Sequence, residues 1–492
     1  MAAYKLSKST FIRGLQCEKS LYLYKHHYNL RDATPESRQA IFDQGTAVGI
    51  LAQELFPKGV DASPEDYTKI ADSVAQTLAF INQGESIIYE ATFMYNDVLA
   101  ALDILVKDAD GWKAYEVKSS TKVSETYLRD AAIQYYTIIN SGIDLKDISI
   151  VHINNQYVRQ GALDIQQLFT IESVHKQVLD FLPQIPDKVE RFKQVIAQPQ
   201  APQVEIGLHC SNPYDCDFKG TCWKHIPEYS VFDIANLRDP KKFDLYNQGV
   251  LTFDQIDFGQ VKLSANQELQ VQAEINNTTF INEVAIREFV GGLQYPLYYL
   301  DFETFGAAVP LYDNSRPYQH LVFQYSLHRQ ESAAATLEHS EYLADATDDP
   351  RIGFVKQLIQ DCGSEGDILV YNINFERGKL KDLAVIFPQY APQINDIINR
   401  LKDLMLPFQK RWYYSPAMKG SYSIKYVLPA LVPELSYADL DIQEGGTASN
   451  TFLAMASGTF KGDVDTTRQQ LLDYCKLDTL AMVKILEKLK EV

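Results

Sequence analysis

The sequence predicts a mixed α/β (α+β) protein that is divided into more than one domain. The chain has 492 residues, and a single hydrophobic core rarely serves more than about 300. The first half contains apolar stretches with strand spacing and one amphipathic helix: strands at 86–94, 98–108 and 147–158, and the helix at 124–140. In the second half, apolar strands are expected directly before Asp301 and before Asn372. Strands and helices that alternate in this way are typical of layered α/β and α+β folds.

Composition and charge restrict the class of protein. Hydrophobic residues make up 46% of the chain and aromatic residues 12%, which is typical of a folded protein. No run approaches the roughly 18 apolar residues of a membrane span, and the first residues lack the apolar core of a signal peptide, so we expect a cytoplasmic protein without a membrane partner. The net charge of -18 argues against a broad, non-specific grip on nucleic acid. A narrow basic groove on an acidic body remains compatible with this charge.

The segment from Leu102 to Ser119 predicts a β-hairpin with carboxylates and a lysine close together. Its turn is expected at Asp110-Gly111, because this dipeptide tolerates positive φ. Side chains alternate along a strand, so Glu116 and Lys118 share one face, and Asp103 on the partner strand can lie close to Glu116. Two carboxylates beside a lysine can bind Mg²⁺ and position an attacking water. The alternative is a surface hairpin with solvated side chains, since this short pattern is common by itself.

Four of the six cysteines are spaced in a way that indicates a metal centre. Cys210, Cys216 and Cys222 are separated by five residues each time, and Cys17 lies far away near the N-terminus. Zinc sites favour cysteine pairs two to four residues apart, so the spacing favours an iron-sulfur cluster. Zinc, or three buried thiols in a loop-rich segment, are the alternatives.

Together, these features resemble the RecB-like PD-(D/E)xK nucleases, and in particular the iron-sulfur branch that includes the CRISPR adaptation nucleases. The resemblance covers residues 1–230 and implies a restriction-endonuclease-like fold. It implies that a 4Fe-4S cluster is held by Cys17, Cys210, Cys216 and Cys222.

The same resemblance implies roles for the hairpin and for the helix that follows it. Asp103 and Glu116 would bind Mg²⁺ or Mn²⁺, Lys118 would serve the water, and we assign Gln134 and Tyr135 to nucleic-acid binding. Many members of the family carry a metal-binding histidine where this chain has Gly49. Glu90 or a water would then replace that ligand.

Residues 231–294 are polar and are predicted to form a helical linker. Within them, residues 245–256 resemble the glycine-turned helix pairs that hold DNA backbones through main-chain amides. A plain helical linker is the favoured interpretation.

Three ordered motifs in the last third of the chain place acidic residues on predicted strands and helices. Asp301 and Glu303 lie two apart at the end of an apolar strand, so they face the same way. Glu376 opens a helix after the next apolar strand, and Tyr474 and Asp478 lie four apart on a helix face. A strand-end surface pair is the simpler interpretation of Asp301 and Glu303 alone, and the three motifs together favour a metal site.

In this order, the three motifs resemble the DnaQ-like, or DEDD, exonucleases of the ribonuclease H fold, over residues 295–492. The resemblance implies that Asp301, Glu303 and Asp478 hold two Mg²⁺ or Mn²⁺ ions and that Tyr474 orients the water. Glu376 stands where that family normally has aspartate.

Residues 409–429 interleave basic and aromatic side chains, which can follow phosphates and stack on bases. Lys419 and Lys425 are therefore candidates for binding nucleic acid, with aromatic core packing as an equal alternative. Asp403 is a further candidate acid.

The sequence as a whole predicts a metal-dependent nuclease with two active centres that acts on nucleic acid, with DNA favoured, and that resembles an uncharacterised bacterial family. The alternative is a non-catalytic nucleic-acid-binding scaffold in which one or both centres have decayed. Gly49 and Glu376 are the features that favour this alternative.

Overall fold

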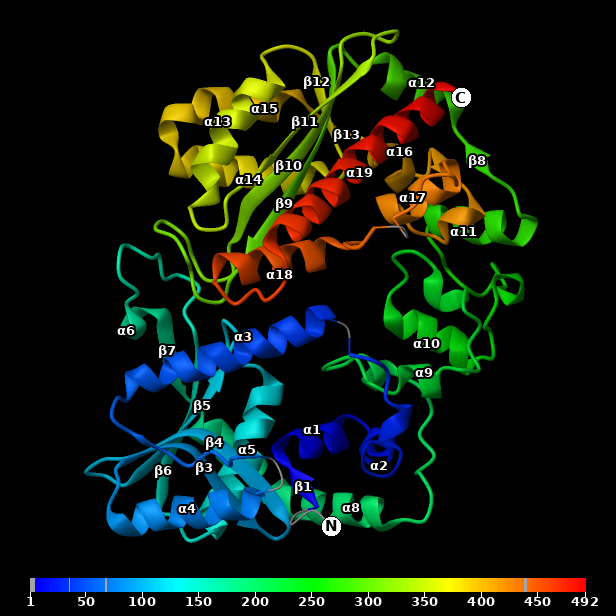
Figure 1. The fold of residues 1–492 in the computed structure, drawn as a ribbon. Helices are drawn as coiled ribbons and strands as arrows, with labels where there is room; N and C mark the ends of the chain where they lie inside the picture. The colour runs from blue at the N-terminus through cyan, green and yellow to red at the C-terminus, as the bar shows by residue number, and fades with distance from the viewer. Residues whose placement is uncertain (1–4, 35, 67–68, 438–439) are drawn as a thin grey trace. The chain divides into compact units, whose positions relative to one another are not determined.

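The computed structural model describes residues 5–34, 36–66, 69–437 and 440–492. The chain forms two compact units (Figure 1). The first unit contains Met1–His225 and Ala308–Tyr318, and the second contains Ile226–Ala307 and Gln319–Val492. Each unit combines helices with a mixed sheet, so the predicted α/β (α+β) class is confirmed.

The first unit is built on a mixed sheet with the strand order β2-β3-β4-β5-β6-β7, and β1 pairs with β4. Its strands are β1 (Leu6–Ser7), β2 (Val60–Asp61), β3 (Ile87–Tyr95), β4 (Val98–Lys107), β5 (Trp112–Lys118), β6 (Leu145–Ile153) and β7 (Phe169–Ser173). The antiparallel pair β4–β5 is the predicted hairpin, with Gly111 at φ 135° in its turn. β6 ends five residues earlier than predicted, because the Asn154 side chain accepts a hydrogen bond from the Gln156 amide and turns the chain.

Helices cover this sheet: α1 (Lys8–Gln16), α2 (Glu18–His26), α3 (Glu36–Ala52), α4 (Ile70–Gln83), α5 (Glu125–Asn140), α6 (Ile165–Leu168), α7 (His175–Phe181), α8 (Ile185–Ala197) and α9 (Lys219–Cys222). The Ser124 hydroxyl accepts a hydrogen bond from the Tyr127 amide and caps α5. α5 joins the parallel strands β5 and β6 and packs against the sheet beside Trp112 and Ala114. Because side chains alternate along β5, Glu116 and Lys118 also face α5.

The second unit contains a five-stranded sheet with the order β11-β10-β9-β12-β13 and a small pair, β8 with β14. The strands are β8 (Phe280–Ile281), β9 (Leu297–Gly306), β10 (His320–Gln330), β11 (Leu337–Leu343), β12 (Asp367–Val370), β13 (Leu401–Asp403) and β14 (Tyr413–Tyr414). β10 is antiparallel to its neighbours, whereas β9, β12 and β13 are parallel. From β9 the chain continues to β10, toward one edge of the sheet, whereas from β12 it continues to β13, toward the opposite edge.

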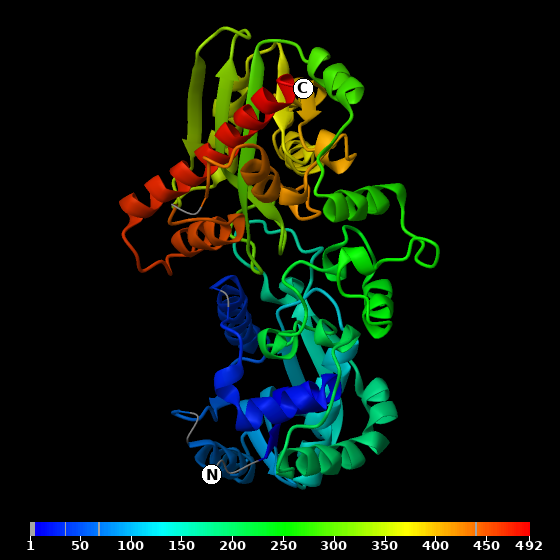
Figure 2. The same ribbon diagram turned by 90° about the vertical axis from the view of Figure 1, so that its right-hand side faces the viewer.

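The helices of the second unit are α10 (Asp239–Asn247), α11 (Ala265–Asn276), α12 (Glu283–Gly291), α13 (Pro350–Cys362), α14 (Ile373–Ile386), α15 (Ala391–Arg400), α16 (Leu406–Gln409), α17 (Ile424–Leu431), α18 (Gly445–Ala456) and α19 (Val464–Lys490). α19 crosses one face of the sheet, and α13, α14 and α15 cover the other (Figures 1 and 2). Within β9, Tyr298 and Leu300 face the α13–α15 side, whereas Leu297 and Tyr299 face α19. This alternation continues along the strand.

Two segments lie in units other than those expected from the sequence. Residues 231–294 are helical, as predicted, but they form part of the second unit and surround a small core that includes Val231, Leu245 and Val271. Ala308–Tyr318 belongs to the first unit, although it separates β9 from β10. The Arg159 guanidinium holds this segment by donating to two of its carbonyl groups at 2.9 Å each.

None of the helices in the described parts of the chain is both long enough and apolar enough to cross a bilayer.

Candidate active sites

The hairpin of the first unit brings Asp103 and Glu116 together. Regular β4–β5 pairing stops at Ile104 and Tyr115, and the Asp103 Oδ2 atom then accepts a hydrogen bond of 2.5 Å from the Val117 amide. This bond places the Asp103 carboxylate against the strand that carries Glu116. The Glu116 side chain is 1% exposed and points toward α5.

Two lysines neutralise Glu116. Lys8 and Lys118 each donate to its Oε1 atom at 2.7 Å, and Lys118 also donates to the Asp130 carboxylate at 2.5 Å. Burial opposes the charge on Glu116, but the two lysines prevail and hold the pKa of Glu116 at about 2. The Glu116 Oε2 atom is buried and has no hydrogen-bond partner among the described residues. A cation at this oxygen would satisfy it.

Asp103 and Glu90 supply two further carboxylates. Burial and the nearby Glu116 charge raise the pKa of Asp103 to about 8. Glu90 lies between Tyr89 and Ala91, which pair with the two neighbours of Asp103 on β4, and it has a positive φ of 53°. Burial raises the pKa of Glu90, and the Glu116 charge adds to this effect. The structure thus places Glu90 at the site, as expected for the residue that would replace the ligand missing at Gly49.

The predicted contact of Gln134 and Tyr135 with nucleic acid is not supported by their positions. Gln134 is 0% exposed, and Tyr135 is buried with its hydroxyl 3.1 Å from His175 Nε2. Tyr135 belongs to the core cluster of this unit and its ring packs against His175 of α7, so neither side chain presents a surface to a ligand. The two polar atoms of the Gln134 amide have no hydrogen-bond partner in the described structure.

Replacing Lys8 with methionine is expected to destabilise the protein by about 1–2 kcal/mol, because it leaves the buried Glu116 carboxylate with one lysine instead of two. The Lys8 side chain is 29% exposed, which reduces the effect below that of a fully buried pair. Urea denaturation at pH 7 measures the change. Lys5→Met is the matched control, because Lys5 pairs with Asp97 on the surface and should change stability by less than about 0.5 kcal/mol. Equal effects of the two substitutions would contradict the prediction.

The four predicted cysteine ligands line one small cavity. Cys17 lies between α1 and α2, and Cys210, Cys216 and Cys222 lie in the segment after α8. Burial raises the pKa of Cys17 and of Cys222, and Cys210 and Cys216 add to both shifts, so the thiols are near neighbours. In the described structure, no three of these sulfur atoms lie within 4.8 Å of one another.

A cavity lined by four thiols can hold a single zinc ion or an iron-sulfur cluster. The choice of the iron-sulfur cluster stays a prediction from the sequence. The segment is also tied to the N-terminal helices without metal, because the Asp217 carboxylate accepts from Arg13 at 2.8 Å and from Arg31 at 2.9 Å.

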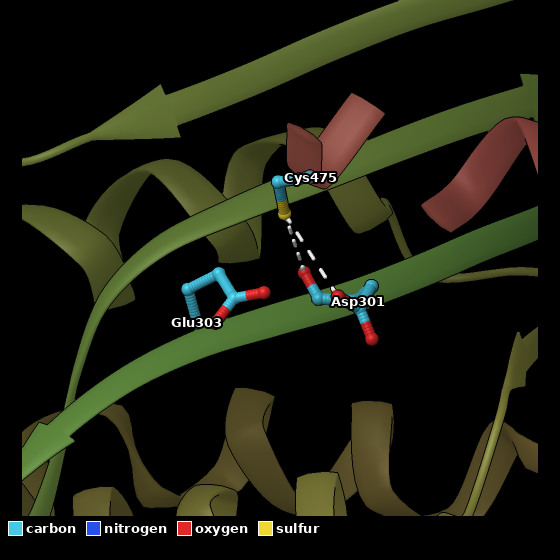
Figure 3. Close-up of side chains that lie close together, drawn as sticks. All are labelled: Asp301, Glu303 and Cys475. Atoms are coloured by element: carbon cyan, nitrogen blue, oxygen red, sulfur yellow. Dashed lines mark hydrogen bonds between the residues drawn. The ribbon is translucent and has the colours of Figure 1, made fainter. Parts of the chain in front are cut away.

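In the second unit, the alternation along β9 directs two acids toward α19. Asp301 and Glu303 follow Leu297 and Tyr299 on the same face, and they meet Cys475 of α19 (Figure 3). One ligand atom from each of these three side chains lies within 4.8 Å of the others. The Cys475 Sγ atom is 3.9 Å from both the Asp301 Oδ2 atom and its carbonyl oxygen.

Asp478 completes this group, one turn after Tyr474 on α19. The Tyr437 hydroxyl donates to Asp478 Oδ1 at 2.6 Å. Burial raises the pKa of Asp478 to about 6, although bonds from the two tyrosines oppose the shift. Burial and the charge of Asp478 also raise the pKa values of Asp301 and Glu303.

Glu376 lies in the first turn of α14 and is 1% exposed. Its Oε2 atom is buried without a hydrogen-bond partner among the described residues. Burial, with a contribution from Asp403, raises the pKa of Glu376 to about 8. The charge of Glu376 in turn contributes to the raised pKa of Asp301. Asp403, the further candidate acid, also accepts a hydrogen bond of 3.2 Å from the Asn372 amide. The structure therefore gathers every acid of the three motifs.

The two candidate lysines differ in position. Lys425 lies above the Tyr437 ring. Its positive charge opposes the rise in the pKa values of Glu303 and Asp478, so Lys425 interacts electrostatically with both acids. Lys419 is 51% exposed and pairs with Glu228 at 3.5 Å on the surface. The aromatic residues of the same stretch divide in a similar way, since Tyr414 is buried in the core and Tyr426 is 45% exposed.

The family model and the relatives that match this chain carry no stated activity. A family model described as "Domain of unknown function (DUF2779)" matches residues 298–423, about a quarter of the chain. This match includes Asp301, Glu303 and Glu376 but ends before α19.

Curated relatives extend the similarity without naming a function. An uncharacterized protein of Ureaplasma parvum serovar 3 (UU173) is 26% identical over 53% of this chain and 41% of its own length. The uncharacterized MG366 homolog of Mycoplasma pneumoniae is 29% identical over 38% of this chain and 31% of its own length. Uncharacterized protein MG366 of Mycoplasma genitalium is 24% identical over the same shares. The chain spans less than half the length of the curated relatives it matches.

Several residues of these sites were not predicted from the sequence. Asp130 lies four residues before Gln134 on one helix face, so helical spacing could have identified it. No spacing in the sequence marks Cys475 as a ligand, so the sequence favours a buried thiol. Cys475 is buried, but its position beside Tyr474 also brings it to Asp301. Lys8 and Tyr437 reach their sites through tertiary packing, and no local pattern marks them.

Without divalent cations, the free energy of unfolding is expected to fall as the pH rises from about 5 to about 8. The pKa values of Asp478, Glu376 and Asp103, about 6, 8 and 8, exceed those of exposed carboxyls. The folded protein therefore binds more protons than the unfolded chain in this window, and loses stability as they dissociate. Glu116 has the opposite shift, so its contribution changes only below about pH 4.5. Thermal denaturation in EDTA at several pH values measures this trend, and a rise of stability with pH would contradict it.

Proposed function

We propose that the chain is a metal-dependent nuclease that hydrolyses phosphodiester bonds of nucleic acid, with DNA the favoured substrate. One observation carries the proposal. Acids from β9, α14 and α19 lie close together: Glu303, Glu376 and Asp478 are buried, and Asp301 is partly buried. None of them forms an ion pair with a described lysine or arginine. Asp301, Glu303, Glu376 and Asp478 would hold Mg²⁺ or Mn²⁺ here.

The physical argument is one of charge compensation. Burying several carboxylates side by side is costly unless they are protonated or face a cation. Carboxylate oxygens are the ligands that Mg²⁺ and Mn²⁺ prefer. Two such ions, when bound, stabilise the attacking and departing oxygens of a phosphoryl displacement. The buried, partner-free Glu376 Oε2 atom fits this use.

The remaining side chains would orient the reactants. Tyr437 fixes Asp478 through a hydrogen bond of 2.6 Å, and Tyr474 lies on the preceding turn of α19, from which its hydroxyl could orient the water. Lys425 provides positive charge on the side of Glu303 and Asp478. The acids also lie where the connections of the sheet change direction, between β9 and β12, which is where open α/β sheets commonly bind ligands.

The first unit would supply a second centre of the RecB-like kind, and the second unit would have the ribonuclease H-like fold. Asp103, Glu90 and Glu116 would bind one ion, and Lys118 would position the water. The four thiols would hold a 4Fe-4S cluster with a structural role.

A specific observation favours the alternative function for the first unit. Lys8 and Lys118 already compensate the charge of Glu116, so this unit needs a metal less than the second unit does. The first unit would then bind nucleic acid without cutting it.

Hydrolysis of labelled single- and double-stranded DNA and RNA, with Mg²⁺ or Mn²⁺, tests both proposals. Loss of cleavage in Asp301→Ala assigns it to the second unit, and loss in Lys118→Ala assigns it to the first. Binding of nucleic acid without cleavage in either metal would overturn the nuclease proposal and favour the scaffold.

A further inference from the structure

The second unit contains a cavity of about 620 Å³. One wall is the segment 232–236, together with Lys242 of α10. The opposite wall is the segment 419–424 that leads into α17, together with Tyr426. Its volume is within the range of pockets that hold small ligands.

Both walls are held in place by buried hydrogen bonds. The Gln270 side chain of α11 accepts from the Ala235 amide at 2.9 Å and donates to the Asp233 carbonyl at 3.1 Å. Gly420 has a φ of 75°, and a Cβ atom there would lie 2.3 Å from Gln270 Nε2. Arg411 donates to the Gly420 carbonyl at 2.6 Å. The cavity is therefore formed before any ligand binds.

The floor of the cavity continues toward the acids. Tyr371 lines it and donates to the Tyr422 carbonyl at 2.8 Å. Tyr371 also contributes to the raised pKa of Tyr437, so the two side chains are near each other. The Tyr437 hydroxyl in turn donates a hydrogen bond to Asp478. Asn372 lines the cavity as well, and it directly precedes α14, which carries Glu376. A ligand in the cavity would thus lie next to the proposed centre.

The chemistry of the lining indicates a nucleic-acid strand. Lys242 and Lys419 supply positive charge, and the Tyr426 ring is 45% exposed. The Asp233 carboxylate also lines the cavity and keeps its negative charge, so two lysines face one carboxylate there. Lys242 and Lys419 pair with Asp239 at 3.4 Å and with Glu228 at 3.5 Å, and a phosphate could replace these surface partners. Exposed aromatic rings bind unpaired bases by stacking, while lysines follow the phosphates.

We propose that this cavity binds the unpaired nucleotides of a single strand whose neighbouring phosphodiester lies at the acidic cluster. The inference rests on the proposed function and adds a substrate class to it: a strand of several nucleotides with unpaired bases. The segment 232–242, which precedes the sheet domain in sequence, thereby becomes part of the substrate site.

Fluorescence anisotropy with a labelled 20-residue oligodeoxythymidine, in EDTA, measures binding separately from cleavage. Tyr426→Ala is expected to weaken binding about 10-fold, and Tyr426→Phe, which keeps the ring, should bind like the unsubstituted protein. Lys419→Ala should weaken binding and reduce the salt dependence of log Kd by about 0.7 per decade of salt. Lys484→Ala is the matched control, because Lys484 lies on α19 outside the cavity and pairs with Glu487. Unchanged affinity in both alanine variants would overturn the proposal.

Cleavage assays distinguish this proposal from the proposed function. With Mn²⁺, Tyr426→Ala should raise the KM for the 20-residue strand and leave hydrolysis of a dinucleotide unchanged, because the dinucleotide does not reach the cavity. Cleavage with identical KM in Tyr426→Ala would overturn the cavity proposal while the nuclease stands. No cleavage by the unsubstituted protein, together with loss of binding in Tyr426→Ala, would overturn the nuclease and retain the strand site.

Discussion

Asp301→Asn is expected to lower the kcat of phosphodiester hydrolysis by about 1,000-fold. Metal ions contribute several kcal/mol to such reactions, and each 1.36 kcal/mol corresponds to about tenfold in rate. Asp301 lies at the centre of the acidic cluster, within reach of Glu303 and close to Asp478. Single-turnover cleavage of a labelled single strand in Mn²⁺ measures the loss.

The same substitution should have an opposite effect on stability in EDTA. Removing the partly buried Asp301 carboxylate relieves repulsion among the other acids, so the midpoint of thermal unfolding should rise. The stabilisation that Mn²⁺ gives to the unsubstituted protein should largely disappear. Asp382→Asn is the matched control, because Asp382 is a half-exposed acid on α14 and should change neither quantity. An Asp301→Asn protein that keeps its activity and its Mn²⁺-dependent stabilisation would refute the assignment of the centre.

Cys17→Ser is expected to reduce the iron content of anaerobically purified protein from about four atoms per chain to less than one. Cys17 is the proposed ligand that would connect the N-terminal helices to the segment after α8. Because metal binding contributes directly to the stability of such segments, the first unit should also lose at least about 3 kcal/mol. The ion pairs of Asp217 with Arg13 and Arg31 should keep the segment partly attached. Iron analysis and thermal denaturation measure the two effects.

Cys362→Ala is the control for iron binding, because Cys362 is a buried thiol in the second unit and should leave the iron content unchanged. The unsubstituted protein should be brown under anaerobic conditions. A colourless protein with one zinc ion per chain would contradict the cluster assignment, because one zinc ion would then occupy the four thiols.

Local periodicity explains which parts of the two sites could be predicted. The alternation of side chains along β9 fixes Asp301 and Glu303 on one face, and helical spacing does the same for Tyr474 and Asp478. In the first unit, the tolerance of Gly111 for positive φ sets the turn that joins β4 and β5. These relationships span a few residues, and the backbone geometry of each element determines them.

Long-range packing explains the residues that local patterns did not reveal. Lys8 contacts Glu116 from 108 residues away, and Tyr437 reaches Asp478 across 41 residues. The burial of Gln134 depends on α5 lying against the sheet, which its own sequence does not specify. A hydrogen bond between distant side chains depends on how whole elements pack, and a pattern within one element carries no information about its partner.

The sequence by itself therefore determined the classes of secondary structure, the spacing of the acidic residues along their strands and helices, and the set of four cysteines. Only the tertiary structure decided that the acids of β9, α14 and α19 converge without an ion pair to any described lysine, whereas Glu116 of β5 pairs with two. It also decided that residues 232–242 form a wall of the cavity beside Tyr426. The reason is that burial and charge compensation are properties of a packed environment, to which segments far apart in the chain contribute.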